Sequence, residues 1–292
     1  NYKSTLDSKK NSIFNLFANY ELDLNLNSFL KSDLFLSIEK VTNDTFLKVF
    51  DTHLQDDLIR PSDNNNLKNE LKLVLNHDEY NLDIGAKSYE NLSKKNSDRY
   101  EYILPYYNYS SILNDNFFNG SLSLNSSSVN ILNNTNQLKS NLNNDLVYSG
   151  NEYISFNTLG SRLNINIKNL NSVGKNNSEY KSSPQVEFMG DINLTTRYPL
   201  IKQTNDNINY LTPKILLKFN PSDMKDYGTS SRTVIVDDIF NSNRLALSDT
   251  LETGKSLTLG IDYKKEQIDN NKFIEFKLAT VLRDKEEKFI PN

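Results

Sequence analysis

The chain has no cysteine and only two histidines and nine glycines among its 292 residues, and these low counts exclude several kinds of chemistry. Without cysteine, neither disulfide bonds nor thiolate chemistry is available. Two histidines, His53 and His77, are too few for a zinc site, which needs three or four ligands. Nine glycines leave little material for a phosphate-binding loop, and the sequence contains neither a P-loop nor a nucleophile elbow. We therefore expect no enzymatic activity, no cofactor and no metal ion.

Long hydrophobic runs and an excess of positive charge are also missing. No run of about eighteen apolar residues occurs, so a helical membrane span is not expected. The net charge of -4 and the pI near 5.4 leave no basic stripe, which argues against nucleic acid as the main partner. Hydrophobic residues make up only 37% of the chain. A soluble domain of this length would therefore have few apolar side chains with which to fill its core. A sheet with one apolar face and one polar face in contact with water fits this composition.

The aromatic content argues against disorder, because the chain holds 15 Phe and 16 Tyr. The length suits one large β-domain or two ordinary domains. No linker-like change of composition and no internal repeat divides the chain, so residues 1–292 are predicted to be part of a single domain. The chain begins at Asn1 without a signal peptide, and we expect the targeting signal to lie upstream in a longer protein.

Strict alternation of apolar and polar residues is the strongest positive signal. In residues 162–168 (RLNINIK), every second side chain is apolar. Successive side chains of a β-strand point to opposite faces, so such a segment has one apolar and one polar face. The pattern recurs along the chain and predicts a large antiparallel sheet. Strands are expected at residues 14–26, 33–40, 45–52, 67–76, 80–89, 100–109, 120–125, 128–132, 146–156, 161–169, 184–196, 210–219, 232–236, 255–264 and 272–282.

The connections between these strands alternate in length. The short turn at 76–79 contrasts with the longer polar segments 91–99 and 220–231, which is typical of outer-membrane barrels. Allowing ~20 residues for each strand and its connection, the chain holds roughly fourteen strands. The predicted fold class is all-β, a large antiparallel transmembrane β-barrel of which this chain forms part. Its leucine, isoleucine, valine and phenylalanine side chains would face lipid, and its polar side chains an aqueous lumen.

Two acidic pairs and one distinctive segment are the candidates for a functional site. Neighbouring residues of a strand point to opposite faces, so Asp56 and Asp57, like Asp237 and Asp238, are expected to be solvated charges. Residues 234–244 run from an apolar stretch through Asp237 and Asp238 to Asn243 and Arg244. We favour a loop held by Asx turns and by a contact of Arg244 with a carboxylate. The alternative is a polar patch of these four residues that faces a lumen, a plug or a sugar headgroup.

Several segments of the C-terminal third have the order and spacing of one family's late barrel region. They are residues 210–221 (YLTPKILLKFNP), 237–244 (DDIFNSNR), Gly254 with 257–263 (LTLGIDY), and 279–291 (ATVLRDKEEKFIP). Together with residues 40–47 and 98–109 further upstream, they resemble the LPS-assembly protein family LptD (OstA). The chain departs from the family at 228–231, where Gly-Thr-Ser-Ser replaces an Asn-Glu-Asp-Ser-like string.

The resemblance implies a very large barrel in the cell outer membrane, surrounded by outer-membrane lipids. Such a barrel receives lipopolysaccharide from a periplasmic bridge protein and inserts it into the outer leaflet, with a lipoprotein plug in its lumen. The family's N-terminal periplasmic domain and its closing strands would lie outside residues 1–292. One alternative is another outer-membrane barrel, a porin or a plugged receptor. Another is a soluble β-sandwich adhesin or binding module, in which apolar faces would meet across a core.

Overall fold

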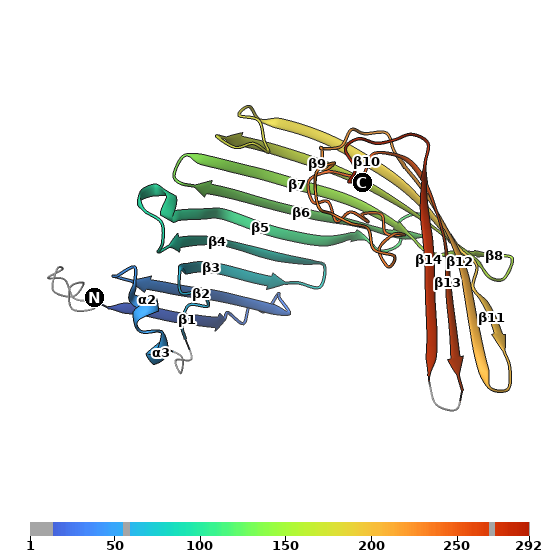
Figure 1. The fold of residues 1–292 in the computed structure, drawn as a ribbon, viewed down its shortest axis with the longest axis horizontal. Coiled ribbons are helices and arrows are strands. Elements are labelled where there is room, and N and C mark those ends of the chain that lie inside the picture. Colours follow the sequence, from blue (N-terminus) through green and yellow to red (C-terminus); the bar gives the residue numbers. More distant parts are fainter. Residues whose placement is uncertain (1–13, 55–58, 269–271, 292) are drawn as a thin grey trace. The chain divides into compact units, whose positions relative to one another are not determined.

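The computed structural model describes residues 14–54, 59–268 and 272–291, and β-strands dominate it (Figure 1). The strands are β1 (Asn15–Asp23), β2 (Lys31–Val41), β3 (Asn66–Asn76), β4 (Tyr80–Asn91), β5 (Tyr100–Asn114), β6 (Gly120–Asn133), β7 (Gln137–Gly150), β8 (Tyr153–Ser155), β9 (Leu159–Lys175), β10 (Gln185–Arg197), β11 (Leu200–Gln203), β12 (Asn207–Asn220), β13 (Gly254–Gln267) and β14 (Phe273–Arg283). The helical elements are α2 (Phe46–Val49), α3 (Asp51–Leu54) and the 3-10 turn η1 (Asn96–Arg99).

The strands form one 14-stranded sheet with the order β1-β2-β3-β4-β5-β6-β7-β9-β10-β12-β13-β14, while β8 pairs with β9 and β11 with β12. Apart from the short strands β8 and β11, strands that follow one another along the chain are neighbours in the sheet, as expected for antiparallel hairpins. The all-β antiparallel fold class is confirmed. Among the described residues β1 and β14 are the two edges and do not pair with each other, so barrel closure stays a prediction.

Two of the predicted strands are wrong. Residues 45–52 fall in α2 and α3, where Phe46 and Leu47 are buried against Val41, Leu67 and Leu92. Burial in this small core outweighs the strand propensity of a segment too short to show a helical period. Residues 232–236 form no strand but lie in the connection from β12 to β13. Among the described residues, no helix has the length and hydrophobicity needed to cross a membrane.

The chain groups into two compact units, which interleave along the sequence. Unit 1 comprises residues 1–110, 126–142 and 171–185, and unit 2 comprises residues 111–125, 143–170 and 186–292. Membership of residues 1–292 in one barrel domain therefore stays a prediction.

Register in unit 1 brings apolar side chains of β1 to β4 onto one face. Leu22 pairs with Leu34, Leu34 with Leu73, and Leu73 with Ile84. The opposite face of the same strands carries charge, because Glu70 forms ion pairs with Lys68 and Lys87, and Lys72 with Asp83. On this charged face the side chain of Tyr106 lies against Gly85, where a Cβ would come within 2.6 Å of the Tyr106 hydroxyl.

In unit 2 the same alternation holds over four strands. One row of paired residues runs Leu194–Leu217–Leu257–Leu282 across β10, β12, β13 and β14. These leucines belong to an apolar face whose large side chains are mostly exposed. We call this surface the apolar face; it consists of Val186, Phe188, Ile192, Leu194, Leu211, Ile215, Leu217, Phe219, Leu257, Leu259, Ile261, Tyr263, Ile274, Phe276, Leu278 and Leu282.

Candidate functional site

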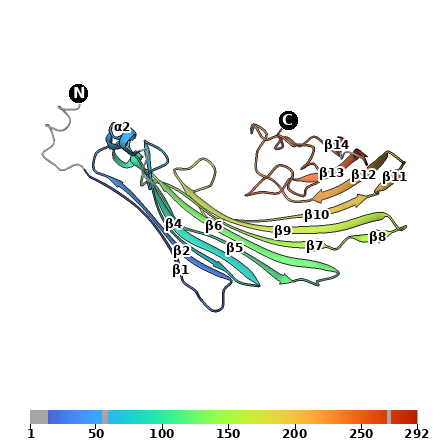
Figure 2. The same cartoon turned by 90° about the horizontal axis from the view of Figure 1, so that it is seen from below.

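The long connection from β12 to β13, residues 221–253, folds back along unit 2, and we call it the strap. Figure 2 shows the strap and the C-terminal end of the chain on one side of β10 and β12. The strand residues beneath the strap alternate with those of the apolar face, and most of them are polar. Asp191, Asn193, Lys218 and Thr258 each have no more than 5% of their surface exposed. The strap therefore covers the polar side of the sheet and leaves the apolar side uncovered.

Arg244 of the strap is the centre of a buried ion network. Its Nε and Nη2 donate to the two carboxylate oxygens of Glu252, at 2.9 and 2.5 Å. Its remaining donors reach Thr258 Oγ1 at 2.9 Å and Ser256 Oγ at 3.0 Å, both on β13. Arg283, at the end of β14, also donates to Glu252. The bidentate geometry and the four hydrogen bonds from one guanidinium group make this contact both strong and directional.

A second layer of the network lies between β10 and β12. Lys218 donates from Nζ to the Ser242 carbonyl of the strap at 2.5 Å and lies 3.2 Å from Asp191. Asp191 accepts further hydrogen bonds from Asn166 at 2.5 Å and from Asn193 at 2.9 Å. Both partners of the Lys218–Asp191 pair are almost fully buried, so the charges stabilise the fold only as a pair.

The local sequence of the strap explains how the Arg244 side chain is positioned toward Glu252. Asn243 accepts from the Leu247 backbone N–H at 2.8 Å and donates to the Leu247 carbonyl at 2.7 Å, which closes a tight turn. Ala246 inside this turn has a φ of 51°. Just before it, Asn241 donates to the Asp238 carboxylate at 2.8 Å. Hydrogen bonds from side chains to the backbone and to other side chains thus order the strap where regular secondary structure is missing.

Apolar contacts hold the strap at three further points. Leu251 packs on Leu170 and Met189, which point from β9 and β10 toward the strap side. Met224, Leu245 and Leu247 form a small core with Tyr227 and with Ile290 of the C-terminal tail. Phe240 lies over Gly260 of β13, where a Cβ would come within 2.6 Å of the ring.

Charges set the ionisation of Glu252. Burial alone would raise the pKa of this carboxyl, but the hydrogen bond from Arg244 and the positive charges of Lys218, Arg244 and Arg283 outweigh burial and lower the pKa. The network contains three cations, Lys218, Arg244 and Arg283, and two anions, Asp191 and Glu252, so its formal charge is one positive unit. These groups can hold a segment or attract an anion, but none is a nucleophile with a nearby base.

The structure separates the four residues that the sequence singles out. Arg244 lies in the buried network, and Asn243 closes the turn beside it. Asp237 forms an exposed ion pair with Lys277 at 2.7 Å, which lowers the pKa of its carboxyl, and Asp238 contacts Asn241. Asp237 and Asp238 share no partner among these contacts. The pair Asp56 and Asp57 lies outside the described residues.

Sequence reasoning missed most of the network. Glu252, Asp191, Lys218 and Arg283 were not singled out, although each is a charged residue beside or within an alternating strand. A charge at a polar-face position next to an apolar-face residue is the signal that marks them: Asp191 precedes Ile192, Lys218 lies between Leu217 and Phe219, and Arg283 follows Leu282. In unit 2 the strap covers part of the polar face, so Asp191, Asn193, Lys218 and Thr258 are buried, and an aqueous lumen stays a prediction. Among the described residues, no group of three or more His, Asp or Glu side chains forms a metal site.

Comparison of the chain with models of known protein families finds no match, and comparison with curated proteins finds none.

Neutralising the anion of the network is expected to destabilise the strap. Glu252→Gln leaves Arg244 buried without a carboxylate, which costs about 3–5 kcal/mol in the free energy of unfolding. Urea unfolding in detergent, with limited proteolysis within residues 221–253, measures the change. The double variant Arg244→Met/Glu252→Leu removes both charges and is expected to recover most of the loss. An unchanged unfolding free energy in Glu252→Gln would contradict the anchoring role of this ion pair.

The strap is also expected to loosen in acid. Because the folded-state pKa of Glu252 lies below its ordinary value of 4.5, its contribution is complete above pH 4.5 and is lost as the pH falls through the folded-state pKa. The difference in stability between the wild type and Glu252→Gln should therefore narrow below pH 4.5. Proteolysis of the strap by an acid-active protease across this pH range tests the expectation. A difference that stays constant would show that Glu252 does not titrate in this window.

Proposed function

We propose that the chain is part of an outer-membrane β-barrel that carries lipopolysaccharide to the outer leaflet. The observation that carries the proposal is the exposure of the apolar face in unit 2, where Phe188 is 72% and Leu278 60% exposed. A contiguous apolar surface of this kind marks contact with protein or membrane, because each such side chain gains ~1.5–3 kcal/mol when it leaves water. Hydrocarbon is a natural environment for it, since the antiparallel sheet satisfies its own backbone groups.

The height of the apolar band on β13 fits a bilayer. On one face of this strand Lys255 and Lys265 enclose Leu257, Leu259, Ile261 and Tyr263. At ~3.4 Å per residue the two lysines are roughly 34 Å apart along the strand. A tilt of about 40° reduces this to roughly 26 Å along the membrane normal, close to the ~25 Å apolar band of outer-membrane barrels. Lysines at both ends can extend to the headgroups.

The resemblance to the LptD (OstA) family supports the choice of cargo. Residues 210–221, 237–244 and Gly254 with 257–263, which carry part of the resemblance, fall in β12, the strap and β13. They supply Lys218, Arg244 and Thr258 of the buried network. In unit 1 the charged face with Glu70, Lys72 and Lys87 offers donors and acceptors for phosphate and sugar groups.

The partners follow from the same proposal. They are lipopolysaccharide, a lipoprotein plug in the lumen, a periplasmic bridge protein and the lipids of the outer membrane. The role requires neither covalent chemistry nor a cofactor. A porin or plugged receptor would share the apolar face but not the resemblance. A soluble β-sandwich would cover the apolar face, which in unit 2 is exposed among the described residues.

A charge on the apolar face is expected to impair membrane assembly. Leu259 lies near the middle of the band on β13, so Leu259→Arg should cost about 2–4 kcal/mol. Gln267→Arg is the matched control, because it adds the same charge to the same face beyond Lys265. Heat-dependent mobility of the protein in gels after insertion into liposomes measures assembly. Equal assembly of the two variants, or wild-type protein that is soluble without detergent, would contradict a membrane-facing surface.

Lipopolysaccharide should contact the polar face. Phe35 and Leu36 are neighbours on β2 that point to opposite faces, because Phe35 pairs with Lys72 and Leu36 with Leu71. A photoreactive amino acid at position 35 is expected to crosslink purified lipopolysaccharide in liposomes. The same amino acid at position 36 should crosslink bulk phospholipid instead. Lipopolysaccharide adducts at position 36 but not at 35 would reverse the assigned faces.

A further inference from the structure

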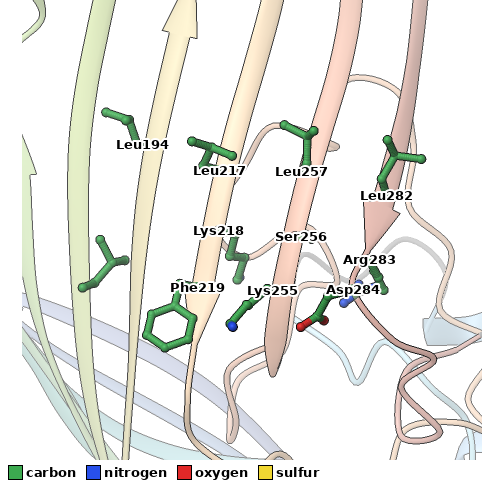
Figure 3. A pocket seen from close by; sticks show the side chains of 11 residues that line it. Leu194, Leu217, Lys218, Phe219, Lys255, Ser256, Leu257, Leu282, Arg283 and Asp284 are labelled. Atoms are coloured by element: carbon green, nitrogen blue, oxygen red, sulfur yellow. The ribbon is translucent and has the colours of Figure 1, made fainter.

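The apolar face of unit 2 is hollowed at one place. Leu194, Leu217, Leu257 and Leu282 lie in a row across β10, β12, β13 and β14 and form the floor of this hollow (Figure 3). Its volume of about 700 Å³ lies within the range of ~300–1,000 Å³ that is typical of small-ligand sites. Four leucine side chains from adjacent strands provide a continuous surface for a hydrocarbon chain.

One end of the hollow carries a pair of opposite charges. Lys255 begins the apolar band of β13, and its Nζ lies 5.8 Å from the ring centre of Phe219. Asp284 follows directly after β14, and both residues border the hollow below the row of leucines (Figure 3). Among the described residues, no ion pair within 4 Å joins Asp284 to a cation or Lys255 to an anion. Both charges are therefore available to a ligand at the edge of an apolar surface.

We propose that this hollow binds one zwitterionic phospholipid with a phosphoethanolamine headgroup. An acyl chain lies on the four leucines, the phosphate contacts the Lys255 ammonium, and the lipid's ammonium contacts the Asp284 carboxylate. The inference rests on the proposed function, because the apolar face must contact lipid for the site to be filled.

Charge complementarity selects the headgroup. A lysine alone at the end of the hollow would favour an anionic lipid, whereas an aspartate beside it repels a net negative headgroup and attracts an ammonium group. The ring of Phe219 adds a surface at the depth where aromatic side chains meet headgroups. The pair of charges is therefore matched to a lipid that carries both signs.

The test compares two lipids with identical acyl chains, phosphatidylethanolamine and phosphatidylglycerol. The full chain is purified in detergent and titrated with each lipid, and retained lipid is counted by native mass spectrometry. The wild type is expected to retain phosphatidylethanolamine at least tenfold more tightly. Asp284→Lys makes the end of the hollow doubly basic and should reverse the preference toward phosphatidylglycerol. Lys255→Glu should weaken the retention of both lipids.

Lys265→Glu is the matched control, since this lysine lies on the same face at the opposite end of β13 and should leave the lipid ratio unchanged. An unchanged ratio in Asp284→Lys, or a wild type that prefers phosphatidylglycerol, would overturn the proposed headgroup. If the wild type enters liposomes but retains neither lipid, the hollow is no lipid site although the membrane proposal stands. If the wild type remains in the aqueous phase without detergent, the proposed function fails first.

Discussion

The structure depends on one constraint, the period of two that an antiparallel strand imposes on its side chains. The register of strand pairing then determines whether the apolar faces of neighbouring strands lie on the same side of the sheet. In unit 2 they do, because Leu194, Leu217, Leu257 and Leu282 pair in one row, while Asn193, Lys218 and Ser256 pair in the row beside it. A slip of one residue in any of these pairs would bring charges into the apolar face and leucines beneath the strap. The apolar surface and the buried network are therefore two consequences of one register.

The sequence predicted the faces of the sheet better than it predicted what covers them. Alternation in residues such as 257–263 requires no knowledge of partners, so the all-β fold and most strands followed from it directly. Partners depend on contacts that are distant in the sequence. Lys218 meets Asp191 only through the pairing of β12 with β10, and Arg283 reaches Glu252 through the pairing of β14 with β13. No local pattern in a single sequence carries that information.

The two incorrect strands have a common physical cause. Residues 45–52 and 232–236 are rich in side chains that favour strands, yet neither segment pairs with a strand of the sheet. Phe46 and Leu47 turn into a small core instead, and Val234, Ile235 and Val236 remain exposed in the strap. Strand propensity expresses how well a side chain fits a pleated surface, so it does not by itself decide the structure of a segment that makes other contacts.

Charged groups anchor the strap because the face that it covers is polar. Apolar side chains in place of Arg244 and Glu252 would leave buried polar groups such as Ser256 and Thr258 without these partners, which is costly. Arg244 resolves this conflict, since one planar side chain satisfies Glu252, Ser256 and Thr258 at once. A strap held in this way depends on the direction of its hydrogen bonds and on charge as well as on apolar contacts. The stability of its attachment therefore depends on the ionisation of Glu252. The stability of the apolar face on the other side of the same strands depends instead on whether water or hydrocarbon surrounds it.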